Sequence, residues 1–334
     1  MMIVLIIGWK LAPSIKIHQE SVELPKEEEK VFINEPIQPI PLTVKEDPKK
    51  VELGSKLFSD TRLSHDNTVS CATCHNLKGA GIDHKRLSMG IDGQFGDVNA
   101  PTVYNSGFNF KQFWDGRADT LEDQVNGPTH NLKEMGSNWD EIIGKLKVDP
   151  NYVSAFLASY SDGITSANIR DAIATFERTL STPNSRFDKF LLGDKNALTS
   201  IEKKGYELFK EHGCVVCHQG INVGSNMFQS FGKFGNYFED RGNITNADLG
   251  RMNVTKNLKD RYKFKVPTLR NIELTAPYFH DGSVKTLDSA VQVMAKYQLG
   301  ISFEPDEIQA IVQFLKTLTG EYEGKPLEGT RDEI

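Results

Sequence analysis

The pentapeptide Cys-x-x-Cys-His occurs twice in this chain of 334 residues and uses all four cysteines. The pattern is the attachment signature of c-type haem, in which two thiols add to the porphyrin vinyl groups and the histidine binds the iron. A zinc site, a redox Cys-x-x-Cys or a disulfide framework are the alternatives, but zinc ligands come in pairs within a short span. Two covalently bound haem c groups are therefore predicted. Their ligands and attachment points are Cys71, Cys74, His75, Cys214, Cys217 and His218.

Length and charge limit what else the chain can do. A chain of 334 residues is long enough for about two domains, which allows one haem in each. The net charge of −6 argues against a nucleic-acid partner, because such a partner needs a basic face.

The N-terminus carries the apolar segment 3–9, which is much shorter than the roughly 20 residues of a membrane-spanning helix. An export signal, a membrane anchor and a mis-set start codon all remain open, because no clear basic region or cleavage site is present. Haem is attached to c-type cytochromes outside the cytoplasm, so a periplasmic protein is predicted. The stretch 17–47 is rich in Glu, Lys and Pro, and it is predicted to be a tether or an extended arm over the first domain.

Apolar residues at helical spacing predict a mainly α fold: two cytochrome c-like haem domains with long loops and little strand. The predicted division is 1–47 for the signal or anchor and the arm, 48–190 for the first haem domain and 191–334 for the second. Both haem motifs follow a helix with a Leu-Phe pair, at 54–58 and 205–209. Residues 75–136 are glycine-rich and are predicted to be loops around the haem. Helices are predicted at 49–58, 138–147, 151–160, 166–180, 200–212, 286–298 and 305–319.

Several further segments make the chain resemble a known family, the bacterial di-haem cytochrome c peroxidases, from about residue 51 to 319. The matching segments are 63–64 (LS), 99–105 (NAPTVYN), 112–118 (QFWDGRA), 134–136 (EMG), 266–271 (VPTLRN), 276–282 (APYFHDG), Met294 and 298–300 (QLG). The resemblance implies an enzyme that reduces hydrogen peroxide to water. It also implies a small c-type cytochrome or a cupredoxin as the electron donor, and a homodimer.

The resemblance also implies roles for individual residues. Glu134 would be the acid and base at the first, peroxide-binding haem, although a glutamate in a loop is otherwise most simply a solvated side chain. Trp114 would carry electrons between the haems, and a core packing role is compatible with this. Met294 would be the second axial ligand of the second haem, for which Met227 and Met252 are competitors. His280 is predicted to be structural.

A calcium site between the haem domains is implied by the resemblance alone. Asn99 would provide its side-chain oxygen, and Thr275 and Pro277 their backbone carbonyls. Oxygen ligands of this kind suit calcium.

The loop after the first motif departs from the family pattern. Many members have a distal histidine about 16 residues after the proximal one, but here Ile91 stands at that place. Isoleucine cannot bind iron, so the first haem is predicted to be open at rest, with His84 or Met89 as alternative ligands. Two other functions remain open: a di-haem electron carrier, and a di-haem oxidase of tryptophan residues on a partner protein. The oxidase has a tyrosine ligand on its second haem, and Met294 argues against it.

Overall fold

The computed structural model describes residues 35–329. The predicted export segment or anchor and most of the arm lie outside the described residues. Within residues 35–329, no helix is long and apolar enough to cross a membrane.

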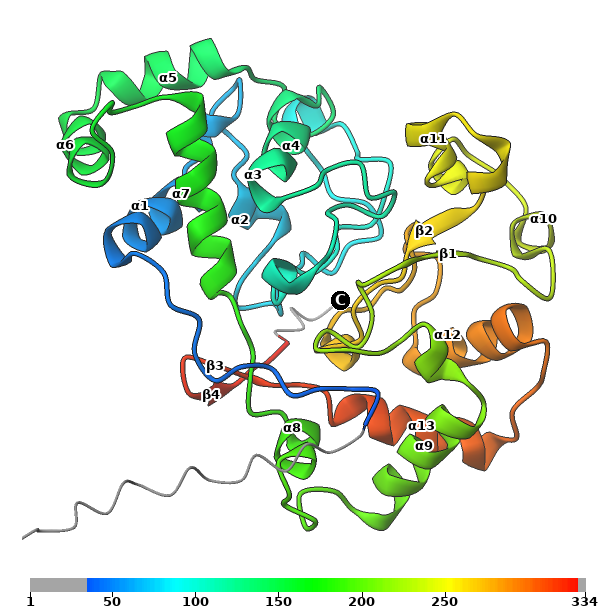
Figure 1. The fold of residues 1–334 in the computed structure, drawn as a ribbon. Coiled ribbons are helices and arrows are strands. Elements are labelled where there is room, and N and C mark those ends of the chain that lie inside the picture. Colours follow the sequence, from blue (N-terminus) through cyan, green and yellow to red (C-terminus); the bar gives the residue numbers. More distant parts are fainter. Residues whose placement is uncertain (1–34, 330–334) are drawn as a thin grey trace, which may run out of the picture. The chain divides into compact units, whose positions relative to one another are not determined.

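The first half of the chain forms a group of helices around the first haem motif (Figure 1). Asp47 caps the first helix by accepting from the backbone N–H of Lys49, and Pro48 occupies the first helical position, where its missing N–H costs nothing. The helices of this half are α1 (Pro48–Phe58), α2 (Cys71–Cys74), α3 (Leu121–Gln124), α4 (Asn126–His130), α5 (Trp139–Lys147), α6 (Pro150–Ser159) and α7 (Ser166–Thr179).

The second half begins with a short helix, α8, that is not among the predicted ones. Thr199 and Glu202 form a capping box at the start of the next helix. The helices of this half are α8 (Arg186–Leu191), α9 (Ser200–Glu211), α10 (Tyr237–Arg241), α11 (Met252–Thr255), α12 (Leu287–Met294), the π-helix η8 (Ala295–Leu299) and α13 (Pro305–Lys316).

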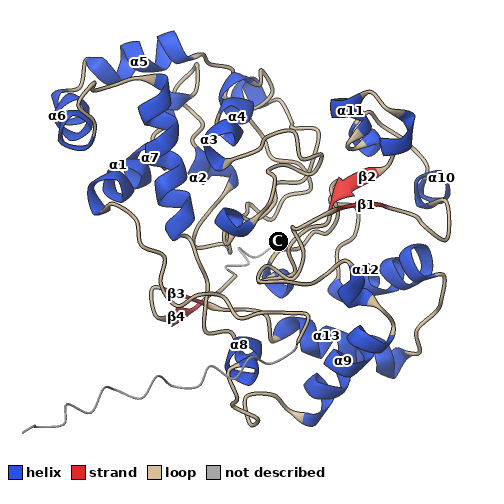
Figure 2. Cartoon of the chain, viewed as in Figure 1, coloured by secondary structure: helices blue, strands red, loops and turns tan. Residues whose placement is uncertain are grey.

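Strand is scarce in the described residues, which confirms the prediction of a mainly helical fold (Figure 2). β1 (Phe228–Ser230) pairs antiparallel with β2 (Lys263–Lys265). β3 (Glu321–Tyr322) pairs antiparallel with β4 (Lys325–Pro326). The predicted helices are confirmed to within a few residues. The exception is 286–298, where the α-helix ends at Met294 and a π-helix follows.

Each half has its own apolar core, built on one pair of crossing helices. α1 packs on α7 in the first half, and α9 packs on α13 in the second. At both crossings a glycine lets the backbones touch: a Cβ on Gly54 would lie 1.9 Å from the carbonyl oxygen of Ala172, and one on Gly205 would lie 1.9 Å from that of Ala310. The two halves therefore repeat one helix-crossing geometry.

The loops that follow the crossing helices repeat as well. The segments 99–105 and 265–271 end in Asn105 and Asn271, which have φ of 61° and 60°. The segments 112–118 and 278–284 each close with an antiparallel bridge between their first and last residues. This repeat makes it possible to compare each position at one haem motif with its equivalent at the other.

Two segments cross between the halves. Residues 35–40 of the arm lie on the second half, where Ile37 is buried in the core and pairs with Gly220. The expectation that the arm covers the first domain is therefore wrong for these residues. The chain end returns to the first half, because Leu327 belongs to its core and the ring of Tyr322 packs 5.1 Å from that of Tyr104. The predicted domain boundary between residues 190 and 191 did not foresee that residues 35–40 lie on the second half or that residues 322–327 lie on the first.

Candidate haem sites

The first motif forms a single helical turn that presents its histidine for metal binding. α2 spans Cys71 to Cys74, and His75 follows at the C-cap. The Nδ1 atom of His75 lies 3.3 Å from the carbonyl oxygen of Gly81. A carbonyl can only accept, so Nδ1 carries the proton and the lone pair of Nε2 is left for a metal.

The second motif reaches the same arrangement through a different turn. Gly213 precedes it with φ of 79°, and residues Cys214–Val216 form a 3-10 turn. The Nδ1 atom of His218 lies 3.4 Å from the carbonyl oxygen of Val223, so this imidazole also has its Nε2 free. Burial lowers the pKa of His218 to about 4 and lowers that of His75, so both rings are neutral, as iron ligation requires.

None of the four cysteines is joined to another by a disulfide, and all four are half-buried. Burial raises the pKa of Cys74 to about 11 and that of Cys214 to about 12. Redox-active cysteines and zinc-binding cysteines instead sit where the thiolate is stabilised. The surroundings therefore argue against both of those alternatives.

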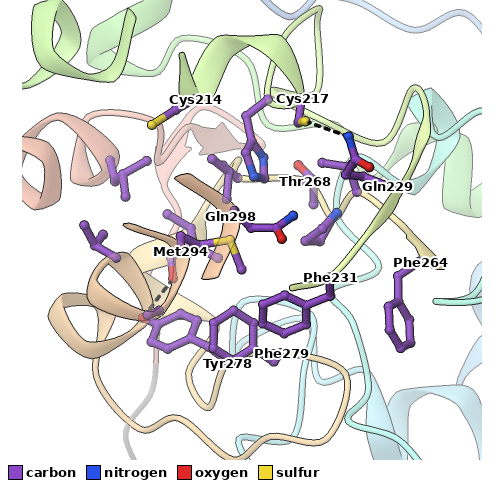
Figure 3. Close-up of a pocket in the computed structure, with 18 of the residues that line it drawn as sticks. Cys214, Cys217, Gln229, Phe231, Phe264, Thr268, Tyr278, Phe279, Met294 and Gln298 are labelled. Carbon is purple, nitrogen blue, oxygen red and sulfur yellow. Dashed lines mark hydrogen bonds between the residues drawn. The ribbon is translucent and has the colours of Figure 1, made fainter. Parts of the chain in front are cut away.

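A cavity of about 490 Å³ lies beside the second motif, within the size range of cofactor sites. Cys214 and Cys217 stand at one wall, and Met294 lies across from them among aromatic side chains (Figure 3). The donor set fits a c-type haem, because two thiols, a neutral imidazole and a thioether line one apolar space. Its other lining residues include Trp114, Phe231, Phe264, Lys265, Thr268, Tyr278, Phe279, His280 and Gln298.

The helix around Met294 explains how this side chain reaches the cavity. α12 ends at Met294, and the wider turn of η8 begins at the next residue. π-turns inside helices are rare and often lie at functional sites. Met227 and Met252 are not among the residues that line the cavity. Of these three methionines only Met294 lines the cavity, and its role as the iron ligand stays a prediction.

A smaller cavity, of about 50 Å³, lies at the first motif. Cys71, Cys74 and His75 line it together with two carboxylic side chains, Glu134 and Glu177. At this volume the fit to a haem rests on the donor set and on the repeat of the second motif. The sequence analysis predicted Glu134 here but missed Glu177.

Glu134 is held in a tight turn that faces the first motif. The backbone N–H of Glu134 donates to the carbonyl of Asn131, and the side-chain amide of Asn131 donates to Oε1 of Glu134 at 2.6 Å. Burial raises the pKa of Glu134, against the opposing effect of the Asn131 hydrogen bond. A partly buried carboxyl with a raised pKa holds its proton more readily than an exposed one, which suits a group that takes and gives a proton.

The loop with Ile91 packs behind the turn that carries Glu134. The backbone N–H of Ile91 donates to the carbonyl of Glu134 at 2.9 Å, and Ile91 is buried. Met89 is 46% exposed, and His84 turns toward the second half, where its Nδ1 lies 3.3 Å from the carbonyl of Ala276. Ile91, His84 and Met89 are all absent from the lining of the first cavity.

Trp114 lies where the two halves meet. Its indole N–H donates to the carbonyl of Asn99, and its own carbonyl accepts from the backbone N–H of Lys265. In the matching bond, the N–H of Asn99 donates to the carbonyl of His280, whose ring lies 6.3 Å from that of Trp114. Trp114 and His280 therefore occupy equivalent places in the two halves, and both line the larger cavity.

His280 is fixed by an acid that the sequence analysis did not identify. Its Nε2 lies 2.7 Å from Oδ1 of Asp248, and the other oxygen of Asp248 accepts from Arg241. Hydrogen bonds from these two side chains hold the pKa of Asp248 far below its usual range, against its burial. This network fits the prediction of a structural role for His280.

The three residues predicted for calcium all line the larger cavity. The side-chain amide nitrogen of Asn99 donates to the carbonyls of Lys85 and Arg86, which leaves its Oδ1 for a cation. Thr275 and Pro277 lie on the segment that follows η7 (Ile272–Leu274). Within residues 35–329, no group of three or more His, Cys, Asp or Glu side chains could hold a metal.

Lys265 is a second site residue that the sequence analysis missed. Its side chain is 7% exposed and lines the larger cavity, and its amine lies 3.5 Å from the hydroxyl of Ser225. Burial lowers its pKa to about 8. Polar and apolar residues alternate in a strand, and a lysine in such a pattern is usually a solvated surface residue. The local sequence therefore does not identify Lys265 as a site residue.

Comparison with known proteins agrees with this geometry. The profile of the family described as "Di-haem cytochrome c peroxidase" matches residues 48–196. Cytochrome c551 peroxidase of Nitrosomonas europaea is 51% identical over 86% of the chain and 85% of its own length. Cytochrome c peroxidase Ccp of Escherichia coli is 52% identical over 86% of the chain, and the match spans 62% of that longer protein.

Among solved structures, a MauG-like protein associated with microbial copper homeostasis is similar over 90% of this chain and 95% of its own, with a TM-score of 0.75. The identity between the two sequences is 30%. The two relatives named as peroxidases are thus more similar in sequence to this chain than this MauG-like protein is.

Proposed function

The chain belongs to the di-haem cytochrome c peroxidase family, and from that membership we propose which of its residues serve the reduction of hydrogen peroxide to water. The enzyme carries two haem c groups, which supply the iron that binds peroxide and the centre that receives electrons. The reaction consumes one peroxide, two electrons and two protons and yields two waters. The convergence of Cys71, Cys74, His75 and Glu134 on one cavity is the observation that supports these assignments most directly.

Glu134 is proposed to move the proton at the first haem. A carboxylate beside bound peroxide can take the proton from one oxygen and return it to the other, so that water leaves. Its raised pKa and the Asn131 hydrogen bond keep it available for both steps. The hydrogen bonds within the 131–136 turn fix its position.

His218 and Met294 are proposed as the residues that would hold the second iron. A thioether ligand would raise the reduction potential of the iron and keep peroxide from it, which suits an electron-entry site. Trp114 is proposed to conduct electrons between the sites, because it is packed at the contact of the two halves and lines the larger cavity.

The remaining assignments are also proposals. Asn99, Thr275 and Pro277 are proposed to bind one calcium ion near Trp114, where it would hold the contact between the halves. The chain is proposed to be a periplasmic homodimer, with an N-terminal export signal or anchor. Its electron donor is proposed to be a small c-type cytochrome or a cupredoxin.

The competing functions make different demands on the same residues. A tryptophan oxidase needs a tyrosine ligand, but the only labelled tyrosine beside Met294 in Figure 3 is Tyr278, whose hydroxyl donates to the carbonyl of Ile272. A simple electron carrier has no use for a partly buried acid at Glu134. A high-spin signal in the oxidised protein favours the peroxidase over the carrier.

We expect the oxidised enzyme to reduce peroxide at once. Prior reduction of the second haem should therefore not be needed to remove a lag. Pro128, in α4, stands at the place equivalent to Met294, because it comes seven residues after Leu121 at the start of α3, as Met294 comes seven residues after Leu287 at the start of α12. Pro128 lines the first cavity without a donor atom. The test is peroxide turnover with a reduced small cytochrome c, with and without prior reduction. If the resting protein has two low-spin haems and His84→Ala turns one high-spin, the open-site proposal is wrong.

Met294→His should lower the potential of the second haem, because imidazole stabilises ferric iron better than a thioether does. Turnover driven by the donor should fall, while the fully reduced enzyme still reacts with peroxide. Redox titration followed by visible spectra measures the change. Met252→Leu is the control, because Met252 lies outside the cavity lining. An unchanged potential in Met294→His would assign the ligand to another residue.

A further inference from the structure

Glu177 is a buried acid that the mechanism above does not use. It lies on α7 and is 6% exposed, and it lines the first cavity beside Cys71. Its Oε2 atom is buried without a hydrogen-bond partner. A buried carboxyl oxygen that lacks a partner is costly to the fold, so packing alone does not account for a glutamate here.

The repeat between the halves shows what packing alone would place there. Gly54 meets the carbonyl of Ala172 on α7, and Gly205 meets that of Ala310 on α13. Ile173 and Glu177 come one and five residues after the contact residue Ala172 in the first half. The second motif has Ile311 and Leu315 at the same places, and all four line their cavities. The first site thus has a carboxyl where its duplicate has an apolar side chain.

The charged groups around Glu177 favour its neutral form. Burial raises the pKa of Glu177 to about 8, and Glu122 on α3 adds to the effect while Arg178 opposes it. Arg178 is occupied elsewhere, in ion pairs with Glu46 and Glu122. α1 packs on α7 through apolar residues, apart from the ion pair of Lys50 with Asp171, and η3 (Ser106–Phe108) carries no charge. From the other walls of the cavity, the titratable groups are Cys71, Cys74 and His75 of the haem motif and Glu134 of the 131–136 turn.

We propose that Glu177 couples proton uptake to reduction of the iron bound at His75. When that iron gains one electron, the carboxylate takes one proton from solvent and becomes neutral. When the electron leaves, the carboxyl releases the proton and its negative charge stabilises the oxidised iron. This inference rests on the proposed function, because it needs a haem at the first motif. It assigns Glu177 a positioning role, separate from the proton transfer at Glu134.

The physical basis is the weak screening of charges inside the fold. Two charges in a buried site interact far more strongly than in water, so each positive charge on the iron stabilises the ionised form of a nearby acid. The acid therefore has a lower pKa when the iron is oxidised than when it is reduced. Between these two values, the potential of the iron must depend on pH.

The test is a redox titration of the first haem across pH in the intact two-haem protein. A pH unit is a tenfold change in proton activity, which corresponds to about 59 mV for one electron. The potential of the wild type should fall toward that slope as the pH rises between the two pKa values of Glu177. Glu177→Leu copies the residue of the second site and should flatten the curve. Glu177→Gln keeps the shape of the side chain and should flatten it as well.

Glu52→Gln is the matched control and should keep the slope, because the Glu52 side chain is 71% exposed on α1, away from the cavity. Glu134→Gln measures separately what the other acid of the cavity contributes to the slope. A flat curve in the wild type overturns the inference, and so does a slope that persists in both Glu177 variants. Haem content is measured first: a chain without haem at the first motif would overturn the proposed function, whereas a flat potential overturns the role of Glu177 alone.

Discussion

Glu134→Gln is expected to lower peroxide turnover by about 100- to 10,000-fold, the usual cost of losing a general acid and base. Glutamine keeps the size of the side chain and can still pair with Asn131, but it cannot take up and return a proton. Glu134 is half-buried and lines the first cavity, which limits the access of water that could replace it. Steady-state turnover of peroxide with a reduced small cytochrome c measures the loss.

Two further variants separate proton transfer from general damage. Glu52→Gln makes the same chemical change on the exposed face of α1, where the Glu52 side chain is 71% exposed, and should leave turnover unchanged. Asn131→Ala removes the hydrogen bond to Glu134 and should have a smaller effect than loss of the carboxyl. Near-normal turnover by Glu134→Gln at normal haem content would rule out the proposed role.

The sequence predicted those parts of the fold that depend on local patterns. Apolar residues at helical spacing placed α1, α5, α6, α7, α9 and α13 within a few residues of their bounds. α8 was missed because it is a single short segment between Pro183 and Gly193, where turn residues dominate the pattern. Its helix is stabilised by tertiary contacts, since Phe187 and Leu191 are buried in the second core.

The site could be predicted where covalent chemistry fixes the spacing. Cys-x-x-Cys-His is a local pattern, so both haem motifs could be found in the sequence. The shifted pKa values of Glu177 and Lys265 instead result from burial, which only the tertiary fold creates. Glu177 had one signal in the sequence: within an otherwise apolar helix face it stands four residues after Ile173. The repeat shows that this glutamate is unusual, because the equivalent residue of the second half is Leu315. Residue roles at Glu134, Trp114 and Met294 stay predictions until they are tested.

Arg270→Met is expected to destabilise the protein by about 3–5 kcal/mol, the usual cost of removing one partner of a buried ion pair. The side chain of Arg270 is fully buried, and its Nη1 donates to Oδ1 of Asp188 at 2.7 Å. The same guanidinium donates to the carbonyls of Gln38 and Ile221, so it joins the arm, α8 and the haem loop. Denaturant unfolding followed by circular dichroism measures the change.

The double variant Arg270→Met with Asp188→Leu tests whether the unpaired charge is the cause. Replacing both partners by apolar residues removes the uncompensated carboxylate, so it should be less damaging than Arg270→Met alone. Arg270→Lys should remain destabilised, because one ammonium cannot span acceptors on three segments that a planar guanidinium reaches together. If the double variant is no more stable than Arg270→Met, the loss comes from the contacts to Gln38 and Ile221. The hydrogen bond of Arg270 to Gln38 would then add to the burial of Ile37 in holding the arm to the second half.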